Sequence, residues 1–276
     1  MTLLSRAAKG PLIMGIINVT PDSFSDGGAY DPLEQARRLI NEGADVLDIG
    51  GESTRPGAEP VSAEAEIARV VPVIAALTAE WPGAISIDTL KPEVARAAFQ
   101  AGATVWNDVT ALSHTPESLD VAADLGGDII LMHMQGEPRT MQAAPHYDDV
   151  VAEVETWLLK HAEAAIRAGV APDRIWLDPG IGFGKTLDHN LALIRATDRL
   201  AAHGFPLLMA ASRKRFIAAL EEREGGVASA AQDRIGGTLA AHLHAIANGA
   251  KMVRVHDVLA MRQAMRVWSA LQGHSC

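Results

Sequence analysis

A short pattern that recurs along the chain constrains the fold more than any other feature. Gly-Ala, then three residues rich in apolar types, then a polar side chain occur as GADVLD (43–48), GAISID (83–88), GATVWN (102–107) and GAKMVR (249–254). Gly43, Gly102 and Gly249 each follow a helical-looking segment, and glycine suits the left-handed position that ends a helix. The apolar residues that follow are too few for a helix, so they predict a buried strand.

An early apolar run and three weaker versions of the pattern bring the predicted strands to eight. They are LIMGIIN (12–18), GDIILMH (127–133), DRIWLD (173–178) and GFPLLMAAS (204–212). Helical segments alternate with them, the longer ones at about 62–80, 146–168, 187–202 and 229–248 and after Asp257. This alternation predicts a parallel sheet, and eight such units predict an α/β fold, a single (β/α)8 TIM barrel domain over residues 1–276. An open doubly wound sheet is the structural alternative.

Three segments carry residues typical of a helix start. Asp31-Pro32-Leu33-Glu34 combines an N-cap, a proline at the first helical position and an acidic third position. Thr115-Pro116-Glu117 repeats this arrangement, and Ser212 of SRKRF (212–216) is a third candidate cap. The basic residues of SRKRF oppose the helix dipole, which indicates either a bound anion or an ordinary capped helix with a basic first turn.

Composition and charge exclude several classes of protein. Apolar residues make up 48% of the chain, enough for a large core, but aromatics are only 4%, so Ala, Val, Leu and Ile must build it. The net charge of −10 argues against nucleic acid or an anionic membrane as the main partner. The only cysteine, Cys276, excludes an internal disulfide and favours a reducing compartment, and the early apolar run is too short for a signal or membrane segment. We therefore expect a cytoplasmic protein.

Polar side chains stand where the eight predicted strands end. They are Asn18, Asp48, Asp88, Asn107, His133, Asp178, Ser212 and Arg254. Any one of them could simply cap the next helix. Because the carboxyl ends of barrel strands form one face, where the active sites of such barrels lie, eight together indicate a common site.

The glycine-rich segment DPGIGFGKT (178–186) does not fit a nucleotide motif. A P-loop would require glycine where Pro179 stands, and the dinucleotide pattern would require glycine where Lys185 stands. What remains is a compact turn after a strand that ends in Asp178.

Two further segments offer groups for binding anions. In RVHD (254–257), Arg254 and His256 are two residues apart on a strand and point the same way, which suits a phosphate. A salt bridge from Arg254 to Asp257 or another carboxylate is the alternative. GGESTRPGA (50–58) is a long polar loop with the donors Ser53, Thr54 and Arg55. No histidine has the spacing of a dedicated transition-metal site.

Eight motifs, taken together and in order, resemble the dihydropteroate synthase family. They are NVTPDSFSDGG, GGESTRPGA, SIDTLKPEVA, NDV, LMHMQGEPRTMQ, LDPGIGFGK, SRK and RVHD, and the resemblance covers about residues 11–270. It implies that the chain is a (β/α)8 barrel, forms a homodimer and is a target of sulfonamides. It also implies the condensation of a dihydropterin diphosphate with p-aminobenzoate in folate biosynthesis.

The resemblance also implies roles for individual residues. Pterin binding falls to Asp88, Asn107, Met132, Asp178, Phe183 and Lys214; diphosphate binding to Asn18, Thr54, Arg55, Arg254 and His256; and p-aminobenzoate binding to Phe24, Pro56, Ser212 and Lys214. Asn18 would contact a Mg²⁺ cofactor that bridges the diphosphate oxygens.

The family's reaction is understood to be dissociative, with diphosphate leaving before the aniline nitrogen attacks. The catalytic set implied for this chain is Asp88, Asp178, Lys214, Arg254 and His256. The first two loops of the family, 18–28 and 50–58 here, would close over the substrate and exclude water.

The chain departs from the family at a few positions, and two other functions compete. Ala210 and Ala211 stand where glycine is frequent, Leu90 where a small or aromatic polar residue is common, and Trp106 where an aliphatic is common. These departures concern the shape of the pterin pocket. The competing functions are a pterin-binding methyltransferase domain, which has no diphosphate to hold, and a pterin-binding paralogue without catalysis.

Overall fold

The structure is a computed structural model, and it describes residues 2–19, 31–52, 60–136 and 140–273. The strands are β1 Leu12–Asn18, β2 Val46–Gly50, β3 Ala84–Asp88, β4 Val105–Asp108, β5 Asp128–Met132, β6 Ile175–Asp178, β7 Leu208–Met209 and β8 Met252–Val255. The helices are α1 Leu3–Ala7, α2 Pro32–Asn41, α3 Ala63–Glu80, α4 Pro92–Gln100, α5 Ser118–Leu125, α6 Val150–Ala168, α7 Leu187–Arg195, α8 Thr197–Ala201, α9 Arg215–Arg223, α10 Ile235–Ala247 and α11 Val258–Leu271.

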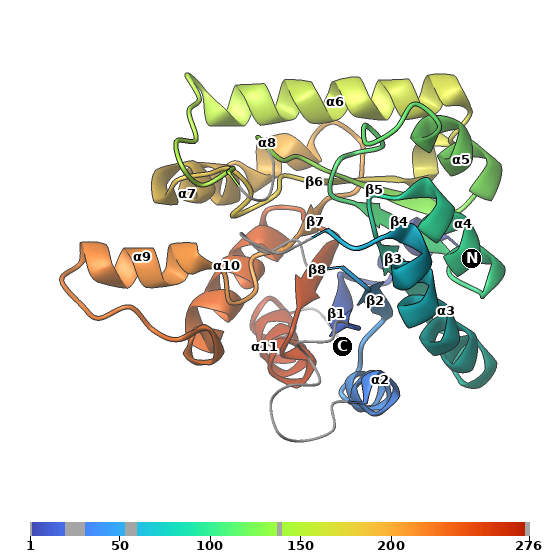
Figure 1. Cartoon of the computed structure of the whole chain (residues 1–276). Coiled ribbons are helices and arrows are strands. Elements are labelled where there is room, and N and C mark those ends of the chain that lie inside the picture. The colour runs from blue at the N-terminus through green and yellow to red at the C-terminus, as the bar shows by residue number, and fades with distance from the viewer. Residues whose placement is uncertain (1, 20–30, 53–59, 137–139, 274–276) are drawn as a thin grey trace.

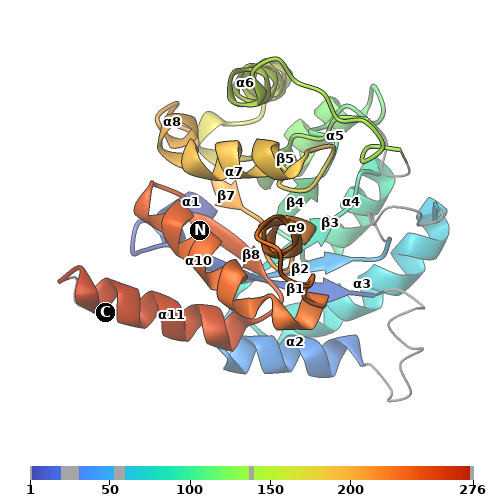
Figure 2. The same cartoon turned by 90° about the vertical axis from the view of Figure 1, so that its left-hand side faces the viewer.

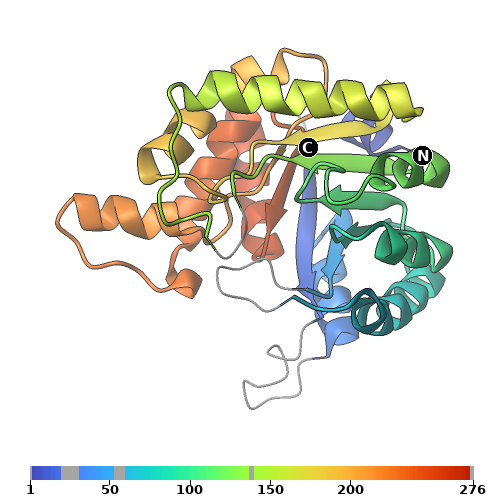
Figure 3. The ribbon, with the colours of Figure 1, turned by 45° about the horizontal axis from the view of Figure 1, so that its top comes forward.

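The eight strands form one parallel sheet that closes on itself. Their order is β6-β5-β4-β3-β2-β1-β8-β7, and a parallel bridge between Leu177 of β6 and Leu207, just before β7, joins the two ends. The helices lie outside the strands (Figure 1). Neighbouring helices such as α10 and α11 lie side by side (Figure 2), and α6 lies along β5 and β6 (Figure 3). The predicted barrel is confirmed, and the open doubly wound alternative is excluded.

Local signals at the helix ends behave largely as predicted. The Asp31 carboxylate accepts the Leu33 N–H at 2.8 Å, and Pro32 occupies the first position of α2. Gly43, Gly102 and Gly249 have φ values of +98°, +115° and +103°, the left-handed conformation expected after a helix.

Several predicted helix boundaries are wrong. Thr115 does not cap α5, which begins at Ser118 with Glu117 at the N-cap position and no side-chain cap. The segment predicted as one helix over 187–202 is divided at Ala196 into α7 and α8. The segment predicted over 229–248 starts as a 3₁₀ turn, Ala231–Asp233, before α10, and the segment predicted from 146 begins at the cap Asp149.

Two apolar clusters build the core on either side of the sheet. The larger lies between the outward strand faces and the helices and includes Trp106. The smaller fills the barrel with inward side chains, among them Met14, Val46, Val105 and Trp176. Because side chains alternate along a strand, inward positions one or two steps further on reach the open end of the barrel. Helix α1 covers the other end, where the Leu3 N–H donates to Asp128 at 3.1 Å.

None of the described helices is long and apolar enough to cross a bilayer.

Candidate active site

Strand register gathers the polar strand ends at one mouth of the barrel. Asp88 of β3 pairs with Asn107 of β4 and with Gly50 of β2, and Asp178 of β6 pairs with Met132 of β5. Asn18 ends β1 beside Gly50. Each of these residues follows a member of the inner apolar cluster by two or four positions on its strand, so their side chains share the interior of the barrel.

Arg254 lies at the centre of this mouth and bridges two carboxylates. Its Nε atom donates to Asp48 Oδ2 at 2.5 Å, and its Nη2 atom donates to Asp88 Oδ2 at 2.6 Å. Asn107 Nδ2 also donates to Asp48 Oδ2 at 3.2 Å, while the buried Asp48 Oδ1 has no hydrogen-bond partner in the described part of the chain. The salt-bridge interpretation of Arg254 is therefore correct, but the partners are Asp48 and Asp88 and not Asp257.

Burial moves the pKa values of the two carboxyls toward neutrality. Burial raises the pKa of Asp88 to about 7, with Asp48 adding to the rise and Arg254 opposing it. Burial likewise raises the pKa of Asp178 to about 6, opposed by the Gly180 N–H and by Lys214. Burial alone would lower the pKa of Arg254. The carboxylates of Asp48 and Asp88 together outweigh this effect, so the pKa of Arg254 is raised. The mouth thus holds carboxyls that titrate near physiological pH beside a permanent cation.

Lys214 reaches the mouth from the start of α9. Its ammonium lies 4.1 Å from the centre of the Phe183 ring, a cation–π contact, and a Cβ on Gly182 would lie 3.2 Å from its Cδ atom. Burial lowers the pKa of Lys214 to about 8, against the influence of Asp178. An amine with this pKa is mostly protonated at pH 7, and a small change in its surroundings can remove its charge.

The glycine turn after Asp178 packs directly on the end of β5. Asp178 Oδ1 accepts the Gly180 N–H at 2.7 Å, and Gly180 has a φ of +68°. A Cβ at Gly180 would lie 1.9 Å from the His133 carbonyl oxygen, and one at Gly184 would lie 2.4 Å from the Gln135 carbonyl oxygen. Only glycine permits this approach, which explains the motif without a nucleotide.

The SRK and RVHD segments are tied to each other. Ser212 Oγ accepts the His256 N–H at 3.2 Å and lies 3.0 Å from His256 Nδ1, so its own hydrogen can donate to that nitrogen. Arg213, with a φ of +57°, donates to both carboxylate oxygens of Asp257 at 2.9 and 2.5 Å. These contacts fix Arg254 and His256 relative to Lys214.

One prediction for SRKRF is therefore wrong. Ser212 does not cap the helix: α9 begins at Arg215, its N-cap is Lys214, and no side chain caps it. The bound anion stays a prediction, and the basic residues of this segment also have partners within the protein. Arg213 pairs with Asp257, Arg215 lies 3.6 Å from Glu222, and Lys214 lies over Phe183.

The structure brings together most of the predicted site residues. Those at the mouth are Asn18, Asp88, Asn107, Met132, Asp178, Phe183, Ser212, Lys214, Arg254 and His256. Phe24, Thr54, Arg55 and Pro56, with most of the two predicted loops, lie outside the described residues.

The departures at 106 and 211 face away from the mouth, contrary to expectation. Trp106 is fully buried in the outer core, where its indole N–H donates to the Thr89 carbonyl at 2.7 Å. Ala211 also packs outward, and its N–H donates to His242 Nε2 at 3.1 Å. Ala210 follows the inward-facing Leu208 by two residues, so it faces the barrel mouth.

Two residues of this region were not assigned a role from the sequence. Asp48 is one of the polar strand ends. It lies two residues before Gly50 on the inward face of β2, and this position could have indicated that it belongs to the site. For Lys185, the sequence shows only a mismatch to the dinucleotide motif. This residue is buried and donates to His133 Nδ1 at 2.9 Å, a contact between distant segments that no local pattern indicates.

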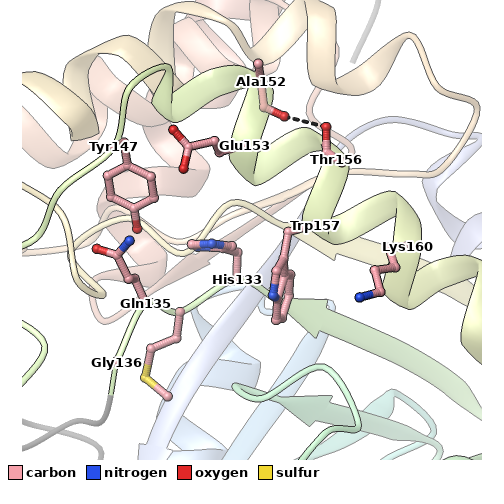
Figure 4. Close-up of a pocket in the computed structure, with 10 residues that line it drawn as sticks. His133, Gln135, Gly136, Tyr147, Ala152, Glu153, Thr156, Trp157 and Lys160 are labelled. Atoms are coloured by element: carbon pink, nitrogen blue, oxygen red, sulfur yellow. Dashed lines mark hydrogen bonds between the residues drawn. The ribbon is translucent and has the colours of Figure 1, made fainter.

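A cleft lies between the end of β5 and α6. Figure 4 shows His133 between Tyr147 and Trp157 in its wall. This cleft has a volume of about 620 Å³. The His133 ring meets Trp157 edge-on at 4.9 Å between centroids. His133 thus lines the cleft and, through its hydrogen bond with Lys185, also contacts the glycine turn of the site.

The donor set at the mouth suits a metal that arrives with an anionic substrate. The described residues contain no group of three or more His, Cys, Asp or Glu side chains that could hold an ion alone. Asn18 supplies one hard amide oxygen at the end of β1. Mg²⁺ commonly takes one or two protein oxygens and completes its shell with substrate phosphates and water, so Asn18 fits such an ion.

Comparison with known proteins gives the same class of site. The family model described as "Pterin binding enzyme" matches residues 14–256. A dihydropteroate synthase of Neisseria meningitidis serogroup B is 51% identical over 272 residues, covering 95% of this chain and 93% of that protein. The Xanthomonas albilineans dihydropteroate synthase structure with 4-aminobenzoic acid has a TM-score of 0.87 at 49% identity, covering 96% of this chain and 94% of that one.

A second Xanthomonas albilineans structure, in complex with 7,8-dihydropteroate, has a TM-score of 0.86 at 45% identity and covers 100% of this chain and 97% of that one. The barrel, its polar mouth and the family model together define a pterin-binding enzyme. Within that class, the chain belongs to the dihydropteroate synthase family, whose members are transferases.

Proposed function

We propose that this chain condenses 7,8-dihydropterin-6-ylmethyl diphosphate with p-aminobenzoate to form 7,8-dihydropteroate and diphosphate. The observation that carries the proposal is the convergence of Asp88, Asn107 and Asp178 on one barrel mouth together with Arg254. Carboxylates suit the N–H donors of a pterin ring, and a guanidinium suits a diphosphate leaving group. Family membership and the Xanthomonas complexes with 4-aminobenzoic acid and 7,8-dihydropteroate support the same substrates.

The pterin ring is assigned to the Asp178 side of the mouth. Asp178 would accept from the amino-pyrimidinone N–H groups, a guanidine-like edge, while Asn107 and Asp88 bind other ring nitrogens. Lys214 would donate to the ring carbonyl or N5. Met132 and Phe183 would pack against the ring. The Gly180 N–H that holds Asp178 Oδ1 at 2.7 Å orients this carboxylate before the ring arrives.

The leaving diphosphate is assigned to Arg254, His256 and Asn18. In the dissociative reaction, the C–O bond to diphosphate breaks first, and its electron pair stays on the leaving group. The guanidinium and the imidazole would stabilise that growing negative charge. The contact of 3.0 Å between Ser212 Oγ and His256 Nδ1 fixes the orientation of the imidazole ring.

The carboxylates Asp88 and Asp178 would favour positive charge on the pterin-methyl cation that remains. The neutral aniline nitrogen of p-aminobenzoate then attacks this carbon and afterwards loses its proton. No activated side-chain nucleophile is required.

Mg²⁺ is the proposed cofactor, held by Asn18 together with substrate oxygens. When bound, it supplies charge neutralisation for the diphosphate. Thr54 and Arg55 of the second loop would also bind the diphosphate.

The p-aminobenzoate pocket is assigned to Ser212, the stem of Lys214, Phe24 and Pro56. Ser212 is already bonded to His256, so in this proposal it links the second substrate's pocket to the diphosphate side. The carboxylate of p-aminobenzoate would lie near the start of α9.

We also propose a homodimer in the cytoplasm. Val267 and Leu271 on one face of α11 are 61% and 79% exposed, which suits an apolar contact between copies. A single cysteine in the chain suits a reducing compartment.

Diphosphate release from the pterin substrate with Mg²⁺, measured with and without p-aminobenzoate, tests the reaction. Release coupled to dihydropteroate formation supports the synthase. Tight pterin binding without release would instead support a non-catalytic paralogue, and transfer of a methyl group from a methylated folate would support a methyltransferase domain.

A further inference from the structure

Lys185 is a buried lysine, 3% exposed, whose hydrogen-bond partners in the described part of the chain are all neutral acceptors. Its ammonium lies 2.9 Å from His133 Nδ1, 3.0 Å from the Phe183 carbonyl oxygen and 3.4 Å from the His133 carbonyl oxygen. A buried ammonium is costly unless it is well bonded, so these contacts form a specific local arrangement.

The protonation of the pair follows from the geometry. Burial lowers the pKa of Lys185 to about 7, against the influence of Asp178; when the amine is protonated, His133 Nδ1 accepts from it and the neutral imidazole carries its proton on Nε2. Burial and the neighbouring ammonium lower the pKa of His133 to about 3, which keeps the ring neutral over the whole physiological range. Lys185 therefore faces a ring that cannot become a competing cation.

The bonds of Lys185 join two parts of the pterin side. One partner, Phe183, belongs to the glycine turn, and its ring lies 4.1 Å from the Lys214 ammonium. The other, His133, follows β5 directly and is braced from the cleft side by the Trp157 ring (Figure 4). The Tyr147 hydroxyl donates to the Gly184 carbonyl at 3.0 Å and holds the same turn from that side.

We propose that Lys185 is a positioning residue for the pterin half of the site. It fastens the Phe183 carbonyl to the rigid His133, so that the Phe183 ring and the Lys214 ammonium keep the arrangement in which they hold the pterin. This inference rests on the proposed function and deepens it, because it assigns the ordering of the glycine turn to one side chain.

Four variants separate positioning from general stability. Lys185→Met removes the donors and retains an apolar chain of similar length. His133→Leu removes the acceptor, whereas His133→Asn keeps an oxygen acceptor near the place of Nδ1. Asp128→Asn is the matched control, because Asp128 is also buried and hydrogen-bonded but lies at the opposite end of the barrel. Each variant is assayed for thermal midpoint, the Kd of free dihydropterin by calorimetry, and the KM of both substrates.

Lys185→Met and His133→Leu should raise the Kd of free dihydropterin and the KM of the pterin diphosphate about tenfold, the loss expected for one charge-assisted hydrogen bond. The KM for p-aminobenzoate at saturating pterin should change less than about twofold. His133→Asn should recover most of the pterin affinity, and Asp128→Asn should lower the thermal midpoint without changing either substrate constant.

Unchanged pterin affinity in folded Lys185→Met overturns the proposal. If Lys185→Met does not fold, equal pterin affinities for His133→Leu and His133→Asn overturn it. Because calorimetry on free dihydropterin needs no turnover, a wild-type chain that binds pterin but releases no diphosphate would refute the proposed reaction and leave this test intact.

Discussion

The Arg254 guanidinium holds the Asp88 carboxylate across the barrel mouth, with 2.6 Å between Nη2 and Oδ2. The two residues are 166 positions apart in the chain, and the same guanidinium also holds Asp48. In the proposed reaction, the diphosphate competes with these carboxylates for Arg254. The charge of Asp88 is then less compensated, at the moment when positive charge develops on the substrate.

Arg254→Ala should lower kcat more than it weakens binding of the free pterin ring, because the proposed partner of Arg254 is the leaving group. Loss of a positioned cation commonly costs about 100-fold or more in turnover. Steady-state turnover and calorimetry on the same preparation give the two numbers. Equal losses in turnover and in pterin affinity would contradict the assignment of Arg254 to the diphosphate.

Asp178→Asn should abolish measurable pterin binding. The carboxylate only accepts hydrogen bonds, whereas the amide would present its own donors to the N–H groups of the ring. We expect a loss of at least about 100-fold in affinity, consistent with the cost of an unpaired buried polar group. Retention of wild-type affinity in calorimetry would show that the ring binds elsewhere.

Pterin affinity should fall as the pH decreases through about 6. The pKa of Asp178 is raised to about 6, so the accepting, ionised form is present above that pH and is lost below it. Because the pterin N–H groups need the ionised form, affinity should fall about tenfold per pH unit well below the pKa. Calorimetry between pH 5 and pH 8 measures this, and a flat profile across pH 6 would exclude Asp178 as the acceptor.

The same raised pKa has the opposite consequence for stability. Between its unfolded value near 3.8 and about 6, the folded state binds more protons at Asp178 than the unfolded state does. Its contribution to the free energy of unfolding is therefore fully present at low pH and declines as the pH rises through this window. Denaturant titrations at pH 4.5 and 6.5 should show that the wild type loses more stability over this interval than Asp178→Asn.

Gly180→Ala should destabilise the protein much more than Gly126→Ala. Both glycines are left-handed, with φ values of +68° and +60°, so both substitutions carry a backbone cost of about 1 kcal/mol. Only at Gly180 would the new Cβ meet another atom, the His133 carbonyl oxygen at 1.9 Å, whereas at Gly126 nothing lies within 4 Å. Chemical denaturation compares the two, and similar losses would show that the turn is not packed on β5 as described.

Local sequence patterns were sufficient for much of the fold. The apolar runs predicted all eight strands, and Gly43 and Asp31 marked helix ends correctly, because these features depend on neighbours within a few residues. The errors fell where a tertiary contact competes with a local one. Ser212 could have capped a helix, but its hydroxyl bonds to His256, 44 residues away. The family comparison predicts that Trp106 affects the shape of the pterin pocket, but strand alternation turns its side chain into the outer core.

The sequence by itself determined that this chain forms a (β/α)8 barrel and belongs among pterin-binding enzymes. The alternation of strands and helices and the order of the motifs are both local properties of the sequence. Only the tertiary structure decided which groups meet at the mouth: Arg254 with Asp48, and Lys185 with His133. The physical reason is that closing the barrel brings distant strand ends into one buried space. There, the loss of water makes each charge depend on whichever partner the fold supplies.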